Sequence, residues 1–171
     1  RFPDGTWDYD EAGTIDYRST NDESKAQAVQ RFLQYAADRL HEAGVYVSAD
    51  VFGECAEKYV TAYGQYWAAI SGVVDAMPSP DHYAASGSWL PWEHPYETMK
   101  TFGEKAAARQ QETPSPAAVR TWIQCYNAIR EPYNTYGPDE VAAQIRALTE
   151  TGNTGGYMTW NGASSLDKYR Y

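Results

Sequence analysis

Apolar residues recur every three or four positions in several stretches of the chain, and each such stretch predicts a helix. The first covers residues 24–43 and precedes Gly44, a residue type common just after a helix end. A mixed stretch at about 55–71, rich in Ala, Tyr and Trp, also predicts a helix. Two more helices are expected at about 95–111 and 138–149, and each opens with a proline in its first turn.

Short runs rich in β-branched or aromatic residues lie between these helices and predict strands at 45–51, 73–77, 119–125 and 156–161. Residues 79–94 are expected to form a long loop. Regular alternation of helices and strands is typical of right-handed βαβ units around a parallel sheet. Four strands could build a small doubly wound sheet or half of a closed barrel. No GxGxxG or P-loop follows any strand, which disfavours a nucleotide-binding sheet.

Composition and charge restrict the partners. The chain has 171 residues, 43% of them hydrophobic, which is enough for a single domain over 1–171. Its net charge of -9 repels nucleic-acid phosphate and anionic lipid, so neither is an expected partner. No apolar run approaches the roughly 20 residues that span a bilayer. No signal peptide is visible, although Arg1-Phe2-Pro3 reads as the middle of a longer sequence.

The cysteines and histidines predict neither a metal site nor a cofactor. Cys55 and Cys125 form no CxxC and have no histidine at metal-ligand spacing, so we expect two half-buried thiols, with one long-range disulfide left open. The three histidines are scattered. Aromatic residues reach 15%, and many lie in loops, where flat rings with a polar edge suit sugars but also suit ordinary interfaces.

Several motifs, in their order along the chain, resemble the DUF4015 family of glycoside hydrolase domains, relatives of bacterial barrel hydrolases that act on polysaccharides. They are residues 47–53, 64–65, 77–83, 94–97, 136–141 and 143–145, Trp122 with Gln124, and Trp160 with Asn161. The resemblance covers essentially the whole chain. It implies a parallel-stranded (β/α) half-barrel, strands five to eight of a TIM barrel, because a complete barrel needs about 250 residues. It also favours an extracellular or cell-envelope location.

The chain departs from the family pattern at two places. Arg1-Phe2-Pro3 resembles the end of the strand-four motif, whose aspartate would lie just upstream of Arg1. After strand six the family has a Met-Val-Tyr-Pro-Ser-His-Tyr type of run, whereas residues 77–83 read MPSPDHY here. The altered loop at 78–81 fits a barrel that binds carbohydrate and has lost catalysis.

Asp50 is the candidate catalytic residue. Barrel enzymes place catalysis at the carboxyl ends of their strands, and glycoside hydrolysis uses two carboxyl groups. Asp50 lies near the end of a predicted strand within a mostly apolar run, so we expect it to be partly desolvated, which favours the protonated form and suits an acid. The alternative is a structural aspartate that caps the next element. Its partner would be the strand-four aspartate. Asp75 is expected to be a core or salt-linked residue, and Asp81 either lines the cleft or lies in a solvated loop, which is the commoner case.

The resemblance places the candidate substrate contacts at Arg1, His82, Tyr83, Trp122, Gln124, Trp160 and Asn161. Trp122 and Gln124 are two positions apart and share one face of their strand, whereas Trp160 and Asn161 point to opposite faces. We expect Trp160 to stack on a sugar and Gln124 to bind a hydroxyl group. Core packing is the alternative for both tryptophans. Arg1 would hold the strand-four carboxylate in position; the alternative is a frayed chain terminus.

These observations favour hydrolysis of glycosidic bonds in a polysaccharide or oligosaccharide, by paired carboxylates at the carboxyl face of a (β/α)8 barrel. A non-catalytic carbohydrate-binding barrel is the main alternative. An α/β protein whose aromatic residues only pack the core is the third possibility, because a fold alone does not define a reaction.

Overall fold

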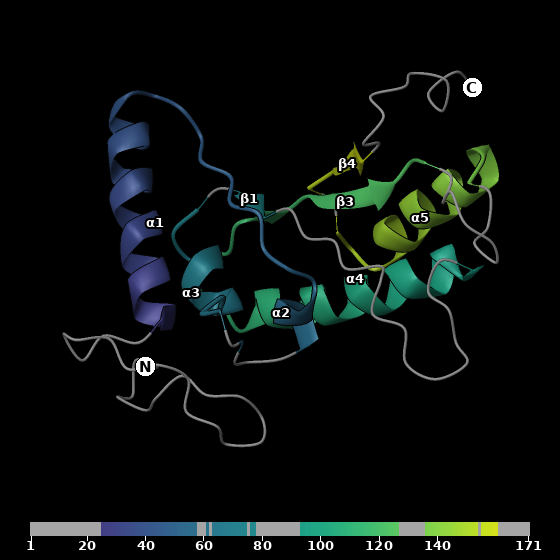
Figure 1. The fold of residues 1–171 in the computed structure, drawn as a ribbon, viewed down its shortest axis with the longest axis horizontal. Helices are drawn as coiled ribbons and strands as arrows, with labels where there is room; N and C mark the ends of the chain where they lie inside the picture. Colours follow the sequence, from purple (N-terminus) through teal and green to yellow (C-terminus); the bar gives the residue numbers. More distant parts are fainter. Residues whose placement is uncertain are drawn as a thin grey trace.

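The computed structural model describes residues 25–57, 61, 63–74, 76–77, 93–126, 136–153 and 155–160. Within them the chain forms an α/β fold with two small parallel sheets of two strands each (Figure 1). The elements, in chain order, are α1 (Lys25–Glu42), α2 (Glu54–Glu57), α3 (Trp67–Ser71), β1 (Ala76–Met77), α4 (Pro95–Gln111), β2 (Ala118–Val119), β3 (Thr121–Gln124), α5 (Pro138–Glu150) and β4 (Tyr157–Trp160). None of these helices is both long and apolar enough to cross a bilayer.

The three long helices confirm the predictions from periodicity and capping. Helices α1, α4 and α5 differ from the predicted ranges by no more than a residue at either end. Gly44 follows α1 with a φ of 77°, the left-handed conformation that ends many helices. At the start of α5, the Gly137 backbone N–H donates to the Glu140 carboxylate at 2.7 Å, and Pro138 takes the first helical position.

The single helix predicted at 55–71 is wrong, because the structure has two short helices there, α2 and α3. Gly64 interrupts the helical pattern. Its φ is 83°, and a Cβ at this position would lie 2.6 Å from the Cβ of Lys25 at the start of α1. The backbone here turns, with the Gly64 N–H bonded to the Thr61 carbonyl at 3.0 Å. The positive φ and the close approach to α1 therefore both require glycine at this position.

The strands pair in parallel, as the alternation of elements predicts. β1 pairs with β2, Ala76 opposite Ala118, and β3 pairs with β4, from Thr121 opposite Tyr157 to Gln124 opposite Trp160. The predicted strand at 119–125 is divided at Arg120 into β2 and β3. The predicted strand at 45–51 is extended chain with one isolated β-bridge at Ser48. The strand predicted at 73–77 shortens to β1.

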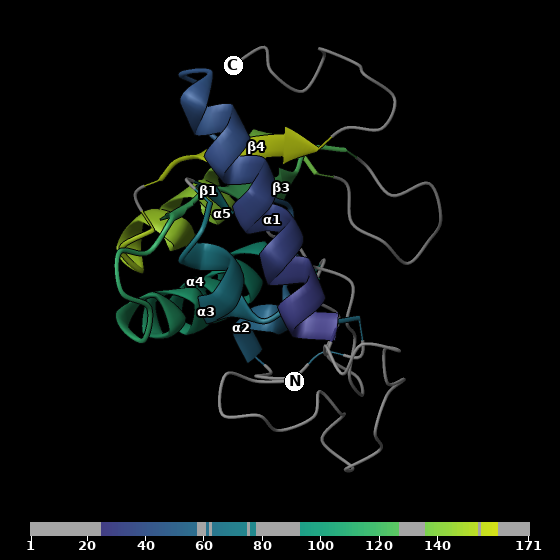
Figure 2. The same ribbon diagram turned by 90° about the vertical axis from the view of Figure 1, so that its left-hand side faces the viewer.

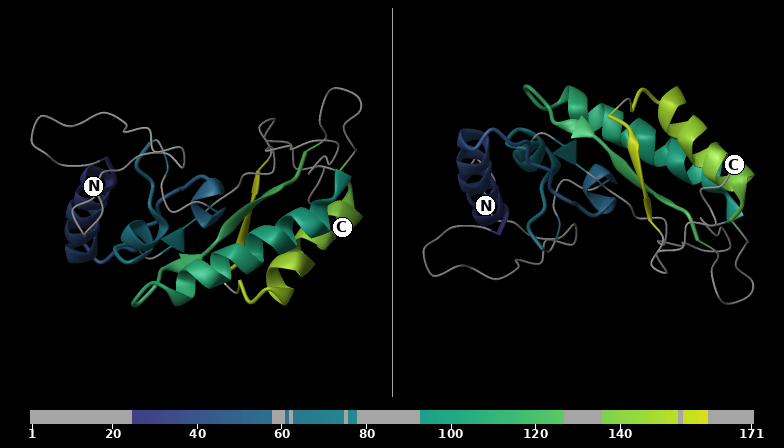
Figure 3. Two further views of the ribbon diagram at one scale, coloured as in Figure 1. Left: turned by 90° about the horizontal axis from the view of Figure 1, so that it is seen from below. Right: turned by 90° about the horizontal axis from the view of Figure 1, so that it is seen from above.

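Two hydrophobic clusters share helix α4. The first joins α1, α3 and α4 to the extended segment 47–51, and its largest side chains are Trp67 and Ile70. The second packs α4 and α5 against β3 and contains Met99, Ile123 and Leu148. Helices α4 and α5 lie side by side along one face of β3 and β4, with α1 at the far end of the molecule from α5 (Figures 2 and 3).

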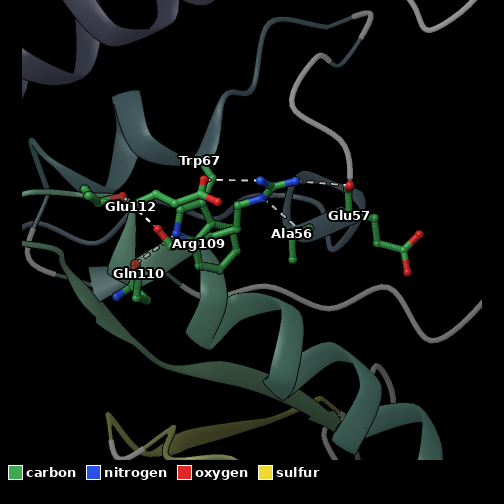
Figure 4. Close-up of polar contacts among 7 residues, drawn as sticks. Ala56, Glu57, Trp67, Arg109, Gln110 and Glu112 are labelled. Carbon is green, nitrogen blue, oxygen red and sulfur yellow. Dashed lines mark hydrogen bonds and ion pairs between the residues drawn. The ribbon is translucent and has the colours of Figure 1, made fainter.

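Polar contacts around Arg109 and Gln110, at the end of α4, connect α2, α3 and α4 with the chain that leads into β2 (Figure 4). The Gln110 side-chain oxygen accepts hydrogen bonds from the Trp67 indole and the Ser71 hydroxyl, both at 2.9 Å, and its amide nitrogen donates to the Ala117 carbonyl. The Arg109 guanidinium donates to the carbonyls of Ala56 and Glu57, at 3.2 Å each, and pairs with the Glu112 carboxylate. These bonds satisfy the carbonyl end of α2 and fix α3 and β2 on α4.

Candidate functional site

Asp50 lies near the end of the extended segment that follows α1. Val47, Ala49 and Val51 pack into the first core cluster, so alternation along the extended chain places Ser48 and Asp50 on the opposite face, and both are exposed. The expectation that Asp50 is partly desolvated is therefore wrong. Its apolar neighbours in sequence face the core, and its carboxylate faces away from them.

Trp122 of β3 contacts this carboxylate. Its indole Nε1–H donates a hydrogen bond to Asp50 Oδ1 at 3.3 Å, although the two residues are 72 positions apart in the chain. The contact joins the predicted catalytic residue to one of the predicted substrate residues. Asp50 therefore lies beside the face of β3 that carries Trp122.

Trp160 of β4 extends this cluster. Its ring meets the ring of Trp122 edge to face, with centroids 5.6 Å apart and an interplanar angle of 90°. In the parallel register Trp160 lies opposite Gln124, and Met158 lies opposite Trp122, so these four side chains share the face turned away from α4 and α5. Trp160 is 55% exposed, whereas Trp122 is half-buried. The exposed ring is the one available for stacking.

Gln124 is on the same face but is only 3% exposed. Its Nε2 donates to the Tyr126 carbonyl at 3.1 Å, and its Oε1 has no hydrogen-bond partner within the described part of the chain. Its backbone N–H and carbonyl are both bound by the Gln144 side chain of α5, at 2.9 and 3.0 Å. A ligand could reach the free oxygen only if neighbouring groups moved.

An open groove of about 400 Å³ borders Asp50 on the side of α1. Its walls are mostly apolar and include Phe32 and Leu33 of α1 and Ile70 of α3; Asp50 and Gln65 are its polar residues. The Gln65 side-chain oxygen accepts the Phe52 backbone N–H at 2.8 Å, which fixes the chain just beyond Asp50.

The family model that matches the chain is DUF4015, described as "Putative glycosyl hydrolase domain", and the match covers residues 1–166. The chain belongs to the DUF4015 family. No curated protein and no solved structure matches it. Family membership supports a general glycosidase role for the chain.

The remaining candidates of this DUF4015 chain fall outside the described residues. Arg1, His82, Tyr83 and Asn161 stay predictions, and Asp75 and Asp81 lie outside as well. The structure therefore brings together three of the predicted residues, Asp50, Trp122 and Trp160, with Gln124 buried beside them.

Neither cysteine forms a disulfide, and both are fully buried, whereas the sequence predicted half-buried thiols. Burial, with a smaller contribution from the Glu54 carboxylate, raises the pKa of the Cys55 thiol to about 12. Its Sγ lies 3.3 Å from the side-chain oxygen of Gln65. Within the described ranges, no three His, Cys, Asp or Glu side chains lie close enough to hold a metal ion.

Sequence reasoning missed Gln144, which holds the end of β3. The available signal is its position on the apolar face of α5, three residues after Val141 and four before Leu148. A glutamine among buried apolar residues needs hydrogen-bond partners inside the protein. What the sequence does not indicate is that those partners are the backbone groups of Gln124.

Proposed function

We propose that this DUF4015 chain supplies strands five to eight of a (β/α)8 barrel that hydrolyses glycosidic bonds in a polysaccharide, with Asp50 as one of two catalytic carboxyl groups. The observation that carries the proposal is the cluster of Asp50, Trp122 and Trp160 on the sheet face opposite α4 and α5. It combines an accessible carboxylate with an exposed aromatic ring. Family membership and the parallel pairing of the strands support it further.

The chemistry needs two carboxyl groups, one on each side of the scissile bond. One protonates the leaving oxygen, and the other acts as a nucleophile or activates water. Asp50 would supply one of them from the carboxyl end of its extended segment. The second would belong to strand four of the barrel, whose motif the sequence Arg1-Phe2-Pro3 resembles at its end.

Substrate binding would rest first on Trp160. Its exposed indole offers a flat apolar surface beside the Asp50–Trp122 pair, and sugar rings have an apolar face that packs on such surfaces. Arg1, His82, Tyr83 and Asn161 are proposed as further contacts. Gln124 would accept a sugar hydroxyl at its free Oε1 once neighbouring groups moved to expose it.

A second candidate function is carbohydrate binding without catalysis. The observation that favours it is the run MPSPDHY at residues 77–83, which departs from the family pattern beside the expected cleft. In that case Trp160 would still stack on a sugar, and Asp50 would serve only as a hydrogen-bond acceptor. An extracellular or cell-envelope location suits both candidates.

The test is turnover and binding by the full-length protein on a panel of soluble polysaccharides, with reducing-end release for turnover and affinity electrophoresis for binding. Asp50→Asn should lower turnover about 10²- to 10⁴-fold and leave binding in place. Trp160→Ala should weaken binding. Asp38→Asn, an exposed aspartate on α1, is the matched control and should change neither quantity.

The outcomes separate the three readings. Full turnover in Asp50→Asn would refute the catalytic role of Asp50. Binding by the wild-type protein without turnover would support the non-catalytic barrel. Neither binding nor turnover on any polysaccharide of the panel would contradict a role in carbohydrate chemistry.

A further inference from the structure

We infer that Trp122 is a positioning residue for Asp50 rather than a stacking platform for the sugar. The inference rests on the proposed catalytic role of Asp50 and assigns the two tryptophans of the cluster different tasks. Trp122 would orient the carboxylate, and Trp160 would contact the substrate.

The first argument is the direction of the hydrogen bond. An indole N–H can only donate, and an ionised carboxylate can only accept, so the Trp122 Nε1–H is suited to the charged form of Asp50. Within the described part of the chain, this is the hydrogen bond that the Asp50 carboxylate accepts. An exposed aspartate without it would be free to turn between rotamers. The contact at Oδ1 leaves Oδ2 for the reaction.

The second argument is that the Trp122 ring is held in place. It is half-buried on β3, its edge-to-face contact with Trp160 is 5.6 Å between centroids, and β3 is paired with β4 along its whole length. A donor fixed in this way loses little freedom when it binds the carboxylate. The N–H edge of the ring is already occupied by Asp50. Trp160, with 55% exposure, keeps free surface for a ligand.

The expected consequence is a loss of turnover without a loss of substrate binding. A hydrogen bond to a charged group is stronger than a neutral one, so removing the Trp122 N–H should lower kcat roughly 10-fold or more while KM stays within about 2-fold. Removing the Trp160 ring should instead raise KM, because that ring would contact the sugar in the ground state as well as in the transition state.

The experiment uses the full-length protein and the polysaccharide of the panel with the highest wild-type turnover. Trp122 is replaced by benzothienylalanine, which keeps the shape of the bicyclic ring and lacks the N–H, and separately by phenylalanine. Each replacement is made in the wild-type and the Asp50→Asn backgrounds. If Trp122 acts through Asp50, its replacement should lower kcat in the first background and have no further effect in the second.

A second readout does not depend on activity. The indole N–H resonance of Trp122, assigned by its loss in Trp122→Phe, should move when Asp50 is replaced by asparagine. The benzothienylalanine protein keeps this test of the N–H valid even if the smaller phenylalanine ring disturbs folding, because it preserves the packing against Trp160.

The results distinguish this inference from the proposed function. If Asp50→Asn is inactive and benzothienylalanine at position 122 leaves kcat at the wild-type value, only the positioning role is overturned. A rise in KM at constant kcat would also overturn it, since that is the behaviour of a platform. If Asp50→Asn is as active as the wild type, or if the wild type turns over no polysaccharide, both the proposed function and the positioning role are overturned.

Discussion

The Gln144 side chain takes the place of a neighbouring strand at the end of β3. Its Oε1 accepts the Gln124 N–H at 2.9 Å, and its Nε2 donates to the Gln124 carbonyl at 3.0 Å and to the Glu140 carbonyl at 3.2 Å. Gln144 is 1% exposed, so water does not compete for these groups. The Gln144 amide therefore supplies the hydrogen bonds that the backbone N–H and carbonyl of Gln124 need, beneath the Asp50–Trp122–Trp160 cluster.

Gln144→Leu keeps a side chain of similar size but removes both hydrogen bonds to Gln124. The N–H and the carbonyl of Gln124 then stay buried without partners, and each such group costs about 1–3 kcal/mol. We expect the free energy of unfolding to fall by about 2–6 kcal/mol in total. In a protein of this size, each kcal/mol lowers Tm by about 2–4 °C.

The assay is thermal and urea unfolding followed by tryptophan fluorescence. Gln34→Leu is the matched control, because Gln34 is an exposed glutamine on α1 whose hydrogen bond, to Asp38 at 2.8 Å, lies at the surface. It should change stability by no more than about 0.5 kcal/mol. Amide hydrogen exchange at Gln124 should also accelerate in Gln144→Leu. Equal stability of the two variants would refute the reasoning.

Two further predictions concern a close packing contact and a buried thiol. Gly103→Ala would place its Cβ 2.1 Å from the Thr151 hydroxyl between α4 and α5, so the free energy of unfolding should fall by about 1–3 kcal/mol. In Gly72→Ala the nearest atom to the new Cβ, the Ala68 carbonyl oxygen, lies at 3.2 Å, so this variant should lose less stability than Gly103→Ala. Comparable urea midpoints for the two variants would contradict this. Cys55, with a pKa of about 12, should resist a thiol reagent at pH 8 until the protein unfolds. Because the folded-state pKa is the higher one, its contribution to stability is present below the ordinary thiol pKa of 9.0 and is lost as the pH rises from there toward 12; a fast-reacting Cys55 in the native protein would rule this out.

The long helices could be predicted from the sequence because their signals are local. An apolar face is read within one element. So are a proline in the first turn, as in α4 and α5, and a glycine after the last turn, as in α1 and α5. The division of 55–71 could not be predicted, because the turn at Gly64 packs closely against Lys25, a residue of another element. Contacts of this kind are set by tertiary packing, which overrides local propensity.

The candidate site could likewise be predicted only in part. Asp50, Trp122 and Trp160 could each be proposed from position near a strand end and from the family motifs. Their mutual contacts could not, because Asp50 and Trp122 are 72 residues apart and meet only through the fold. The expected desolvation of Asp50 failed for a related reason. Apolar neighbours in sequence bury a side chain in an extended segment only if it faces the same way as they do.

Alternation along the strands also separates the residues of the site from the residues of the core. On β3, Ile123 packs with Met99 and Leu148 beneath the sheet, while Trp122, one position away, faces Asp50 on the other side. The two faces therefore have different tasks. One packs against α4 and α5, and the other orients the Asp50 carboxylate. Gln124 belongs to both, since its side chain lies on the face of the site and its backbone is held by α5 through Gln144.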